Sequence, residues 1–215
     1  MEGSVQSVST PRTRIALIEE NVVMVAERQE GVIARRQIRE CGMSDATVAR
    51  WVERGRLHRR HPGVYALGHR RISERGELIA GLLYAGPGAA LAGLSATAWW
   101  EITKSMPRVI EVATAHRRRS VPGVKVSFRP GVERVKHRGL PVTPLPRALL
   151  DLARLVPRRT LRRALSEADY LGLLNPEAVV AMCGPGRAGS KGSAGHSTTT
   201  SPCWPIPAMN WKSGS

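Results

Sequence analysis

The chain has 215 residues, which allows one domain or two small ones and is long enough to bury a hydrophobic core. The 33 Lys and Arg residues outnumber the 17 Asp and Glu residues and give a net charge of +16 at pH 7, so polyanions, and nucleic acid first, are the expected partners. Aromatic residues make up only 4% of the chain, which disfavours a sheet that reads RNA or single strands by base stacking.

The sequence also indicates in which cellular compartment the protein is found and whether it binds a cofactor. No run of about 18 apolar residues occurs, and the polar stretch Met1–Pro11 lacks the apolar region of a secretory signal, so we expect a cytoplasmic protein without a membrane partner. The cysteines Cys41, Cys183 and Cys203 have no C-x-x-C spacing, and this favours free thiols over a disulfide framework or a zinc site. We expect neither a metal nor another cofactor.

The first third of the chain predicts three helices and a hairpin. Apolar residues recur with the helical period over Ile15–Gln29, and Ala34–Cys41 has the composition of a second, short helix. Ser44 is a good N-cap residue for a third helix. Residues 56–61 and 64–68 are expected to form two short strands around a Pro-Gly turn. The short turn between the second and third helices predicts a helix-turn-helix with the hairpin as its wing.

Many small helical domains contain two helices joined by a short turn and do not bind DNA. The charge distribution favours the DNA-binding interpretation here, because arginines are concentrated in this one segment. They are Arg35, Arg36, Arg39, Arg50, Arg54, Arg56, Arg59 and Arg60. We therefore predict a winged helix-turn-helix DNA-binding domain over residues 12–70.

Residues 71–182 are predicted to form a small α+β domain. The expected helices are Glu74–Tyr84, Ala89–Trp100, Pro146–Leu155 and Thr160–Leu174, and the expected strands are Val109–Ala113 and Val124–Phe128. In the last of these helices, Leu161, Leu165, Ala168 and Leu171 are expected to point inward. The arginines at its start, Arg158, Arg159, Arg162 and Arg163, are either a solvated face or a set of phosphate contacts.

The last segment, residues 183–215, is rich in Gly, Ser, Thr and Pro and has no hydrophobic period, so we expect it to be disordered. The fold class that follows is α+β, mainly helical: an N-terminal winged helix-turn-helix, a small α+β domain and a disordered tail.

Several strings of this sequence resemble the AbiEi-type antitoxins. The most specific is GRLHRRHPGVYALG at Gly55–Gly68. Further matching stretches are Gly31–Ile33, Arg36–Ile38, Gly42–Ser44, Gly86–Leu91, Ser95–Trp99, Glu111–Val112, Gly139–Thr143 and Arg147–Leu152. The later stretches are similar to the middle domain of actinobacterial proteins that carry this module, and the whole resemblance runs from about Ala16 to Val180.

The resemblance implies a function for each part of the chain. The winged helix would bind operator DNA and repress its own operon, and the following domain would oppose a nucleotidyltransferase toxin. The actinobacterial proteins usually continue into a domain similar to very-short-patch repair endonucleases, which this chain does not match. Permissible codons for Gly192–Ser215, read in another frame, encode an amphipathic helix. This suggests the hypothesis that the native reading frame was lost between about Cys183 and Gly192.

The chain is not expected to be an enzyme. A restriction-type nuclease centre needs an E-x-K or D-x-K strand motif, in which carboxylates hold Mg²⁺ and the lysine steadies the attacking water. No Glu or Asp is followed by Lys two positions later. Glu111, in a predicted strand, is expected to have a structural or partner-facing role.

Double-stranded DNA is the expected partner of the third helix. With Val48, Trp51 and Val52 turned inward, the candidate base-reading residues are Thr47, Arg50 and Ala46, because arginine can bind a guanine edge and threonine offers a hydroxyl and a methyl group. The candidate phosphate contacts are Arg35, Arg36, Arg54, Arg56, Arg59 and Arg60. The tip of the hairpin could enter a minor groove.

Two other functions compete with an autorepressing antitoxin. The chain could be the remnant of an endonuclease-like protein that only tethers to DNA non-specifically, or an interaction module whose arginines meet an acidic toxin. Preference for one DNA sequence at high salt separates the regulator from both alternatives, because a chain of charge +16 binds any polyanion to some extent.

Overall fold

The computed structural model describes residues 11–183, and the chain divides into two compact units, Met1–Leu174 and Asn175–Ser215. The described part of the second unit is α8 (Pro176–Cys183), a helix that the sequence analysis missed. The expected disordered tail lies outside the described residues from position 184 onward. No helix of the described part is long and apolar enough to span a membrane.

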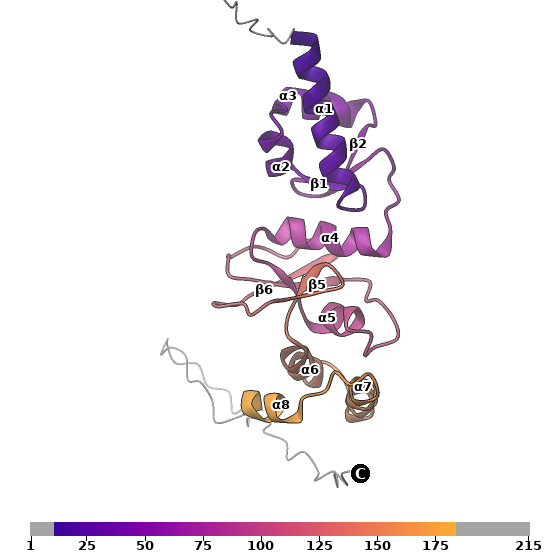
Figure 1. Cartoon of the computed structure of the whole chain (residues 1–215), viewed down its shortest axis with the longest axis vertical. Coiled ribbons are helices and arrows are strands. Elements are labelled where there is room, and N and C mark those ends of the chain that lie inside the picture. The colour runs from indigo at the N-terminus through magenta and orange to yellow at the C-terminus, as the bar shows by residue number, and fades with distance from the viewer. Residues whose placement is uncertain (1–10, 184–215) are drawn as a thin grey trace, which may run out of the picture. The chain divides into compact units, whose positions relative to one another are not determined.

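The first unit begins with the predicted winged helix-turn-helix. Its elements follow in the order α1 (Pro11–Glu27), β1 (Val32–Ala34), α2 (Arg35–Glu40), α3 (Asp45–Glu53), β2 (Leu57–His61) and β3 (Val64–Leu67). The three strands form an antiparallel sheet in the order β1-β3-β2, and Figure 1 shows the three helices gathered around it. The α+β class and the wing-like hairpin are confirmed.

A small apolar core holds these helices against the sheet. Trp51 is only 3% exposed, as its position between Val48 and Val52 predicted, and Ile38 is fully buried. The core is formed by Val22, Ala26, Ile33, Ile38, Met43, Val48, Trp51, Leu57 and Tyr65. Because α3 buries Val48 and Trp51, the opposite side of this helix is left in solvent.

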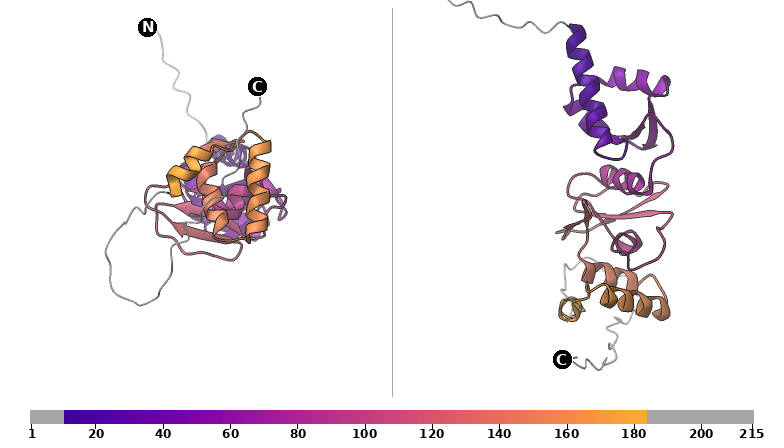
Figure 2. Two further views of the ribbon diagram at one scale, coloured as in Figure 1. Left: turned by 90° about the horizontal axis from the view of Figure 1, so that it is seen from below. Right: turned by 45° about the vertical axis from the view of Figure 1, so that its right-hand side comes forward.

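A mixed sheet follows, with helices on both of its faces. The elements are α4 (Glu74–Ala85), β4 (Ala90–Leu91), α5 (Gly93–Trp99), β5 (Ile110–Thr114), β6 (Val124–Phe128), β7 (Val135–His137), β8 (Leu140–Val142), α6 (Leu145–Ala153) and α7 (Arg158–Tyr170). The strand order is β6-β5-β4-β8-β7. Both figures place α4 on one face and α5 on the other, with α6 and α7 beyond α5 (Figures 1 and 2).

Two expectations for this region were wrong. The helix predicted over Ala89–Trp100 begins only at Gly93, because Ala90 and Leu91 form a strand that pairs with β5 and β8. Leu171, expected to point inward, lies after the end of α7 and is 40% exposed, while Ala164 takes a buried place on that helix. The strands β1, β4, β7 and β8 were not predicted.

The winged helix-turn-helix and the mixed sheet share a core through α4. Val32, Ala34 and Val64 of the small sheet are in the same buried cluster as Leu78 and Leu82 of α4. Polar contacts join the same surfaces: Arg75 of α4 forms an ion pair with Glu30, and Ser73 donates a hydrogen bond to that carboxylate. The sheet side of the winged helix-turn-helix is therefore an internal surface of the first unit, and its helix side is left for a partner.

Candidate nucleic-acid interface

The exposed face of α3 begins with a hydrogen-bonded series of side chains. Ser44 caps the helix, as predicted, by accepting a hydrogen bond from the Thr47 backbone N–H at 3.3 Å. The hydroxyl groups of Ser44 and Thr47 lie 3.0 Å apart, and Arg50 Nη2 donates to Thr47 Oγ1 over 3.0 Å. Ala46 and Arg50 are exposed and Thr47 is half-buried. The structure therefore brings the three candidate base-reading residues together on one face.

A carboxylate at the start of α3 fixes this helix to α2. Asp45 forms ion pairs with Arg35 at 2.9 Å and with Arg39 at 2.6 Å. The hydrogen bonds from Arg35 and then Arg39 lower the pKa of Asp45 to about 2. The carboxylate also lies in the first turn of α3, where the helix dipole favours negative charge. Asp45 offsets part of the positive charge of these two arginines and links the start of α3 to α2.

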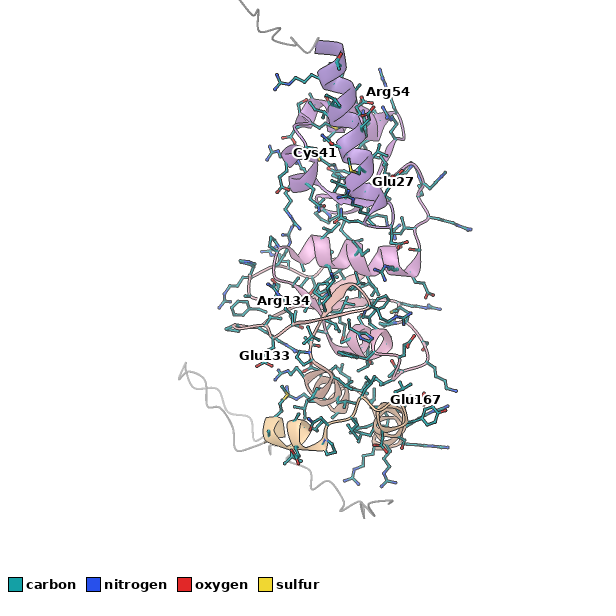
Figure 3. All side chains as sticks on the ribbon, in the orientation of Figure 1. Glu27, Cys41, Arg54, Glu133, Arg134 and Glu167 are labelled. Atoms are coloured by element: carbon teal, nitrogen blue, oxygen red, sulfur yellow. The ribbon has the colours of Figure 1, made fainter. Side chains whose placement is uncertain are left out.

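A shallow hollow of about 250 Å³ separates α3 from the hairpin. Its rim carries Asp45, Glu53 and Arg59, and its floor contains Val48 and Tyr65. Arg59 is exposed, as the candidate phosphate contact must be, and Arg54 lies at the surface just beyond the end of α3 (Figure 3). Arg59 thus borders the hollow beside α3, and Arg54 follows Arg50 by one helical turn.

Three other candidate phosphate contacts are held by neighbours within the chain. The Arg56 guanidinium lies 3.8 Å from the ring centre of Trp51 and forms an ion pair with Glu19 at 3.2 Å. Arg36 donates to the Leu83 carbonyl over 3.2 Å, and Arg60 forms an ion pair with Glu77. Arg36 and Arg60 therefore turn toward α4. The roles of all nine candidate residues in DNA binding stay predictions.

The sides of the hairpin pack against the rest of the first unit, and contact of its tip with a minor groove stays a prediction. His61, at the end of β2, is 8% exposed and its ring centre lies 5.8 Å from that of Tyr84 on α4. Burial, and then the neighbouring Arg60, lower the pKa of His61. Val64, on the other side of the turn, is 1% exposed in the core shared with α4. Only the turn itself, with Pro62 exposed, faces solvent.

The carboxylate of Glu111 has the structural role that was expected. Its Oε2 accepts a hydrogen bond from the Leu94 backbone N–H at 3.0 Å, and its Oε1 forms an ion pair with Lys125 at 2.8 Å. A Cβ atom at Gly93 would collide with the same carboxylate, and Gly93 has φ +52°. Among residues 11–183, no group of three or more His, Cys, Asp or Glu side chains is arranged to hold a metal ion.

Sequence reasoning did not assign a role to the loop after β5. Arg117 lies with its guanidinium 4.8 Å from the ring centre of Phe128, and Arg118 lies 4.5 Å from that of Tyr84. The Arg119 carbonyl accepts a hydrogen bond from the Tyr84 hydroxyl at 2.8 Å. The run of arginines was visible in the sequence, but its position next to the hairpin depends on contacts between distant residues.

Comparison with known proteins agrees with this geometry in the N-terminal part. Residues 20–68 match the profile of the family described as "Transcriptional regulator, AbiEi antitoxin". A solved structure, that of the RV2827C protein from Mycobacterium tuberculosis, is similar at 18% sequence identity and a TM-score of 0.37, over 77% of this chain and 80% of that one. No curated protein matches the sequence. The family match thus identifies a domain of the AbiEi antitoxin type of transcriptional regulator within residues 20–68 alone.

Proposed function

We propose that this protein is a sequence-specific DNA-binding repressor of its own operon, with α3 in the major groove. The observation that carries the proposal is the exposed series Ser44–Thr47–Arg50 on a helix that is fixed on its other side by Val48 and Trp51. A base-reading side chain discriminates best when its position is set before binding, and Thr47 supplies a fixed acceptor for Arg50. The family match of residues 20–68 supports the same function.

The proposed contacts divide into two classes. Thr47, Arg50 and Ala46 read base edges, with the Arg50 guanidinium donating to a guanine and the small side chain of Ala46 allowing close approach. Arg54 and Arg59 bind backbone phosphates on either side of these base pairs. Arg35 and Arg56 remain in their ion pairs with Asp45 and Glu19 and add to the positive electrostatic potential of the surface. We leave Arg36 and Arg60 out of the proposed DNA-binding residues, because both donate to groups of α4.

The direct test compares the full chain on two duplexes by fluorescence anisotropy. One duplex is the region upstream of its own coding sequence and the other is a scrambled version of the same length and composition. We expect the upstream duplex to bind far more tightly, with the difference retained between about 50 and 200 mM salt, because base contacts are less sensitive to salt than phosphate contacts. Parallel, steeply salt-dependent curves on the two duplexes would contradict the proposal and favour a non-specific DNA-tethering protein.

Arg50→Ala is the sharpest variant for this test. It should cost about 1 to 3 kcal/mol of binding free energy on the upstream duplex and little on the scrambled one, because it removes a base contact. Arg59→Ala is the matched control, since it removes one exposed arginine of the neighbouring hairpin and should weaken both duplexes equally. An unchanged ratio of the two affinities in Arg50→Ala would overturn the assignment of α3 as the reading helix.

We further propose that residues 71–174 bind a nucleotidyltransferase toxin. Exposed apolar side chains at the end of α7 support this, since Tyr170 is 86% exposed and Leu171 and Leu173 lie beside it in the sequence. If a nucleotidyltransferase is encoded next to this gene, the two proteins should co-purify, and Tyr170→Ser should weaken the complex without changing affinity for the upstream duplex. A Tyr170→Ser complex of unchanged affinity would exclude this end of α7 as the docking surface.

A further inference from the structure

We infer that the loop His116–Arg119 is a second DNA-contacting element, which binds the phosphate backbone beside the base pairs read by α3. The inference rests on the proposed function, and it extends the DNA site from the winged helix-turn-helix onto the following sheet.

The loop lies next to the hairpin turn through two contacts. Tyr84 on α4 contacts His61 of the hairpin on one side and the loop on the other, where it meets the Arg118 guanidinium and the Arg119 carbonyl. At Gly123, after the loop, an added Cβ would lie 3.7 Å from His61 Cε1. The arginine-rich loop therefore borders the same turn that a free wing would present to DNA.

A continuous series of contacts leads from the loop to the start of the reading helix. The hairpin turn is joined to α2 by the hydrogen bond from the Arg35 backbone N–H to the Gly63 carbonyl at 2.8 Å. The Arg35 side chain in turn forms the ion pair with Asp45, in the first turn of α3. The N-terminal residues of a recognition helix are the ones that contact base edges, and the duplex continues past them for a further part of its turn of about 34 Å. We therefore place the loop along the path of a duplex held by α3.

The charges of the loop are uncompensated. Within residues 11–183, none of Arg117, Arg118 and Arg119 forms an ion pair with a carboxylate, whereas Arg35, Arg56 and Arg60 of the winged helix-turn-helix all do. Adjacent like charges repel one another, so three neighbouring arginines without a carboxylate do not help this loop to fold. Such a cluster of unpaired arginines is expected on a surface that binds an anion.

Two of the three guanidinium groups are also held in place. Arg117 lies over Phe128, which is 44% exposed, and Arg118 lies over the buried Tyr84. Stacking on a ring face restricts the side chain but leaves the N–H groups at the edge of the guanidinium free to donate to phosphate oxygens. The loop therefore combines positive charge with limited freedom, which lowers the entropy lost when phosphate is bound.

The test compares two triple variants with the same change in charge. Arg117→Gln/Arg118→Gln/Arg119→Gln neutralises the loop, and Arg159→Gln/Arg162→Gln/Arg163→Gln neutralises three exposed arginines of α7. On the upstream duplex, the loop variant should reduce the slope of log affinity against log salt by about 2 to 3, close to one for each phosphate that is no longer bound. The α7 variant should leave that slope unchanged. Hydroxyl-radical footprints should lose protection at the flank of the site in the loop variant alone.

The outcomes separate this inference from the proposed function. If the unmodified protein does not distinguish the upstream from the scrambled duplex, the proposed function fails and the inference fails with it. If it does distinguish them, and the loop variant keeps the original slope and footprint or weakens binding no more than the α7 variant, only this inference is overturned. Circular dichroism checks that both variants fold, and Arg117→Gln alone replaces the triple variant if that one does not, with a slope reduced by about 1.

Discussion

Ser44 makes two contacts with Thr47 on the exposed face of α3, and the two contacts have different roles. Its oxygen accepts from the Thr47 backbone, which stabilises the start of α3, and it lies within hydrogen-bond distance of the Thr47 hydroxyl, which orients the acceptor for Arg50. One side chain thus links the stability of α3 to the placement of its candidate base-reading residues.

The change Ser44→Ala should therefore affect both properties. We expect a loss of about 1 kcal/mol in the free energy of unfolding from the missing cap, together with a lower ratio of affinities for the upstream and scrambled duplexes. Ser73→Ala is the matched control, because Ser73 caps α4 by accepting from the Gly76 N–H at 3.0 Å and is not part of the α3 face. Urea unfolding and fluorescence anisotropy measure the two effects. Equal affinity ratios in the two variants would show that Ser44 only caps the helix.

Asp45 gives a stability effect that depends on pH. Its pKa of about 2 lies below its ordinary value, so the unfolded chain binds the proton more tightly than the folded protein does. The stabilisation is complete above the ordinary pKa and is lost as the pH falls toward about 2. The Asp45→Asn variant lacks this stabilisation. The difference in unfolding free energy between the unmodified protein and the variant should therefore be constant near neutral pH and should shrink as the pH falls from about 4 to about 2.

Urea unfolding across that pH range measures this difference. Asp169→Asn is a suitable control, because Asp169 is exposed near the end of α7, outside the helix-turn-helix. A difference for Asp45→Asn that keeps its full size down to pH 2 would contradict the assignment of the low pKa to the ion pairs with Arg35 and Arg39.

At the scale of elements, the contact between the hairpin and α4 depends on the ion pair of Arg60 with Glu77. Both side chains are about one-third exposed, so solvent screens the attraction only in part. A double-mutant cycle with Arg60→Gln and Glu77→Gln should give a coupling energy of about 1 kcal/mol by urea unfolding. The pair of Arg138 with Glu101, at 50% and 61% exposure, is the control and should give a smaller coupling. The reverse order would show that burial does not set the strength of these pairs.

The sequence predicted those helices and strands that are specified by residues close together in the chain, such as a capping residue or an apolar period. The start of α3 follows from Ser44 and its inward face from the spacing of Val48 and Val52, and both agree with the structure. The strands β1 and β4 have three and two residues, and their buried residues show no alternation. They are strands because β3, β5 and β8 pair with them from distant parts of the chain, which composition and periodicity do not encode.

The candidate site divides in the same way. The exposure of Ala46, Arg50 and Arg54 could be predicted from helical periodicity, because the apolar residues of α3 fix its orientation. The positions of Arg36 and Arg60 could not, because their partners Leu83 and Glu77 are on α4. The packing of the hairpin sides could not be predicted for the same reason: a Pro-Gly turn between basic strands is typical of an exposed hairpin, but His61 and Val64 are buried against α4.

At the scale of the whole molecule, we expect the shared core to make residues 11–174 unfold as one cooperative structure. Val64→Ala removes a side chain that is 1% exposed where β3 meets α4, and we expect it to cost about 2 kcal/mol. Hydrogen exchange should show amides of α3 and of β5 losing protection by the same amount. Val180→Ala, at an exposed position of α8, should change neither. Loss of protection confined to α3 and its neighbours would show that the two parts unfold separately.

The burial of Val32, Ala34 and Val64 against α4 also bears on how relatives of this protein can diverge. The winged helix-turn-helix has one side constrained by α4, and the proposed DNA-binding side is not constrained by any internal neighbour among residues 11–183. If these residues read the operator as proposed, substitutions at Ala46, Thr47 and Arg50 change its sequence without disturbing the core, whereas a change at Val64 must be matched by a change on α4. New operator specificities should therefore arise by single substitutions on α3, and the winged helix-turn-helix and α4 should be inherited together.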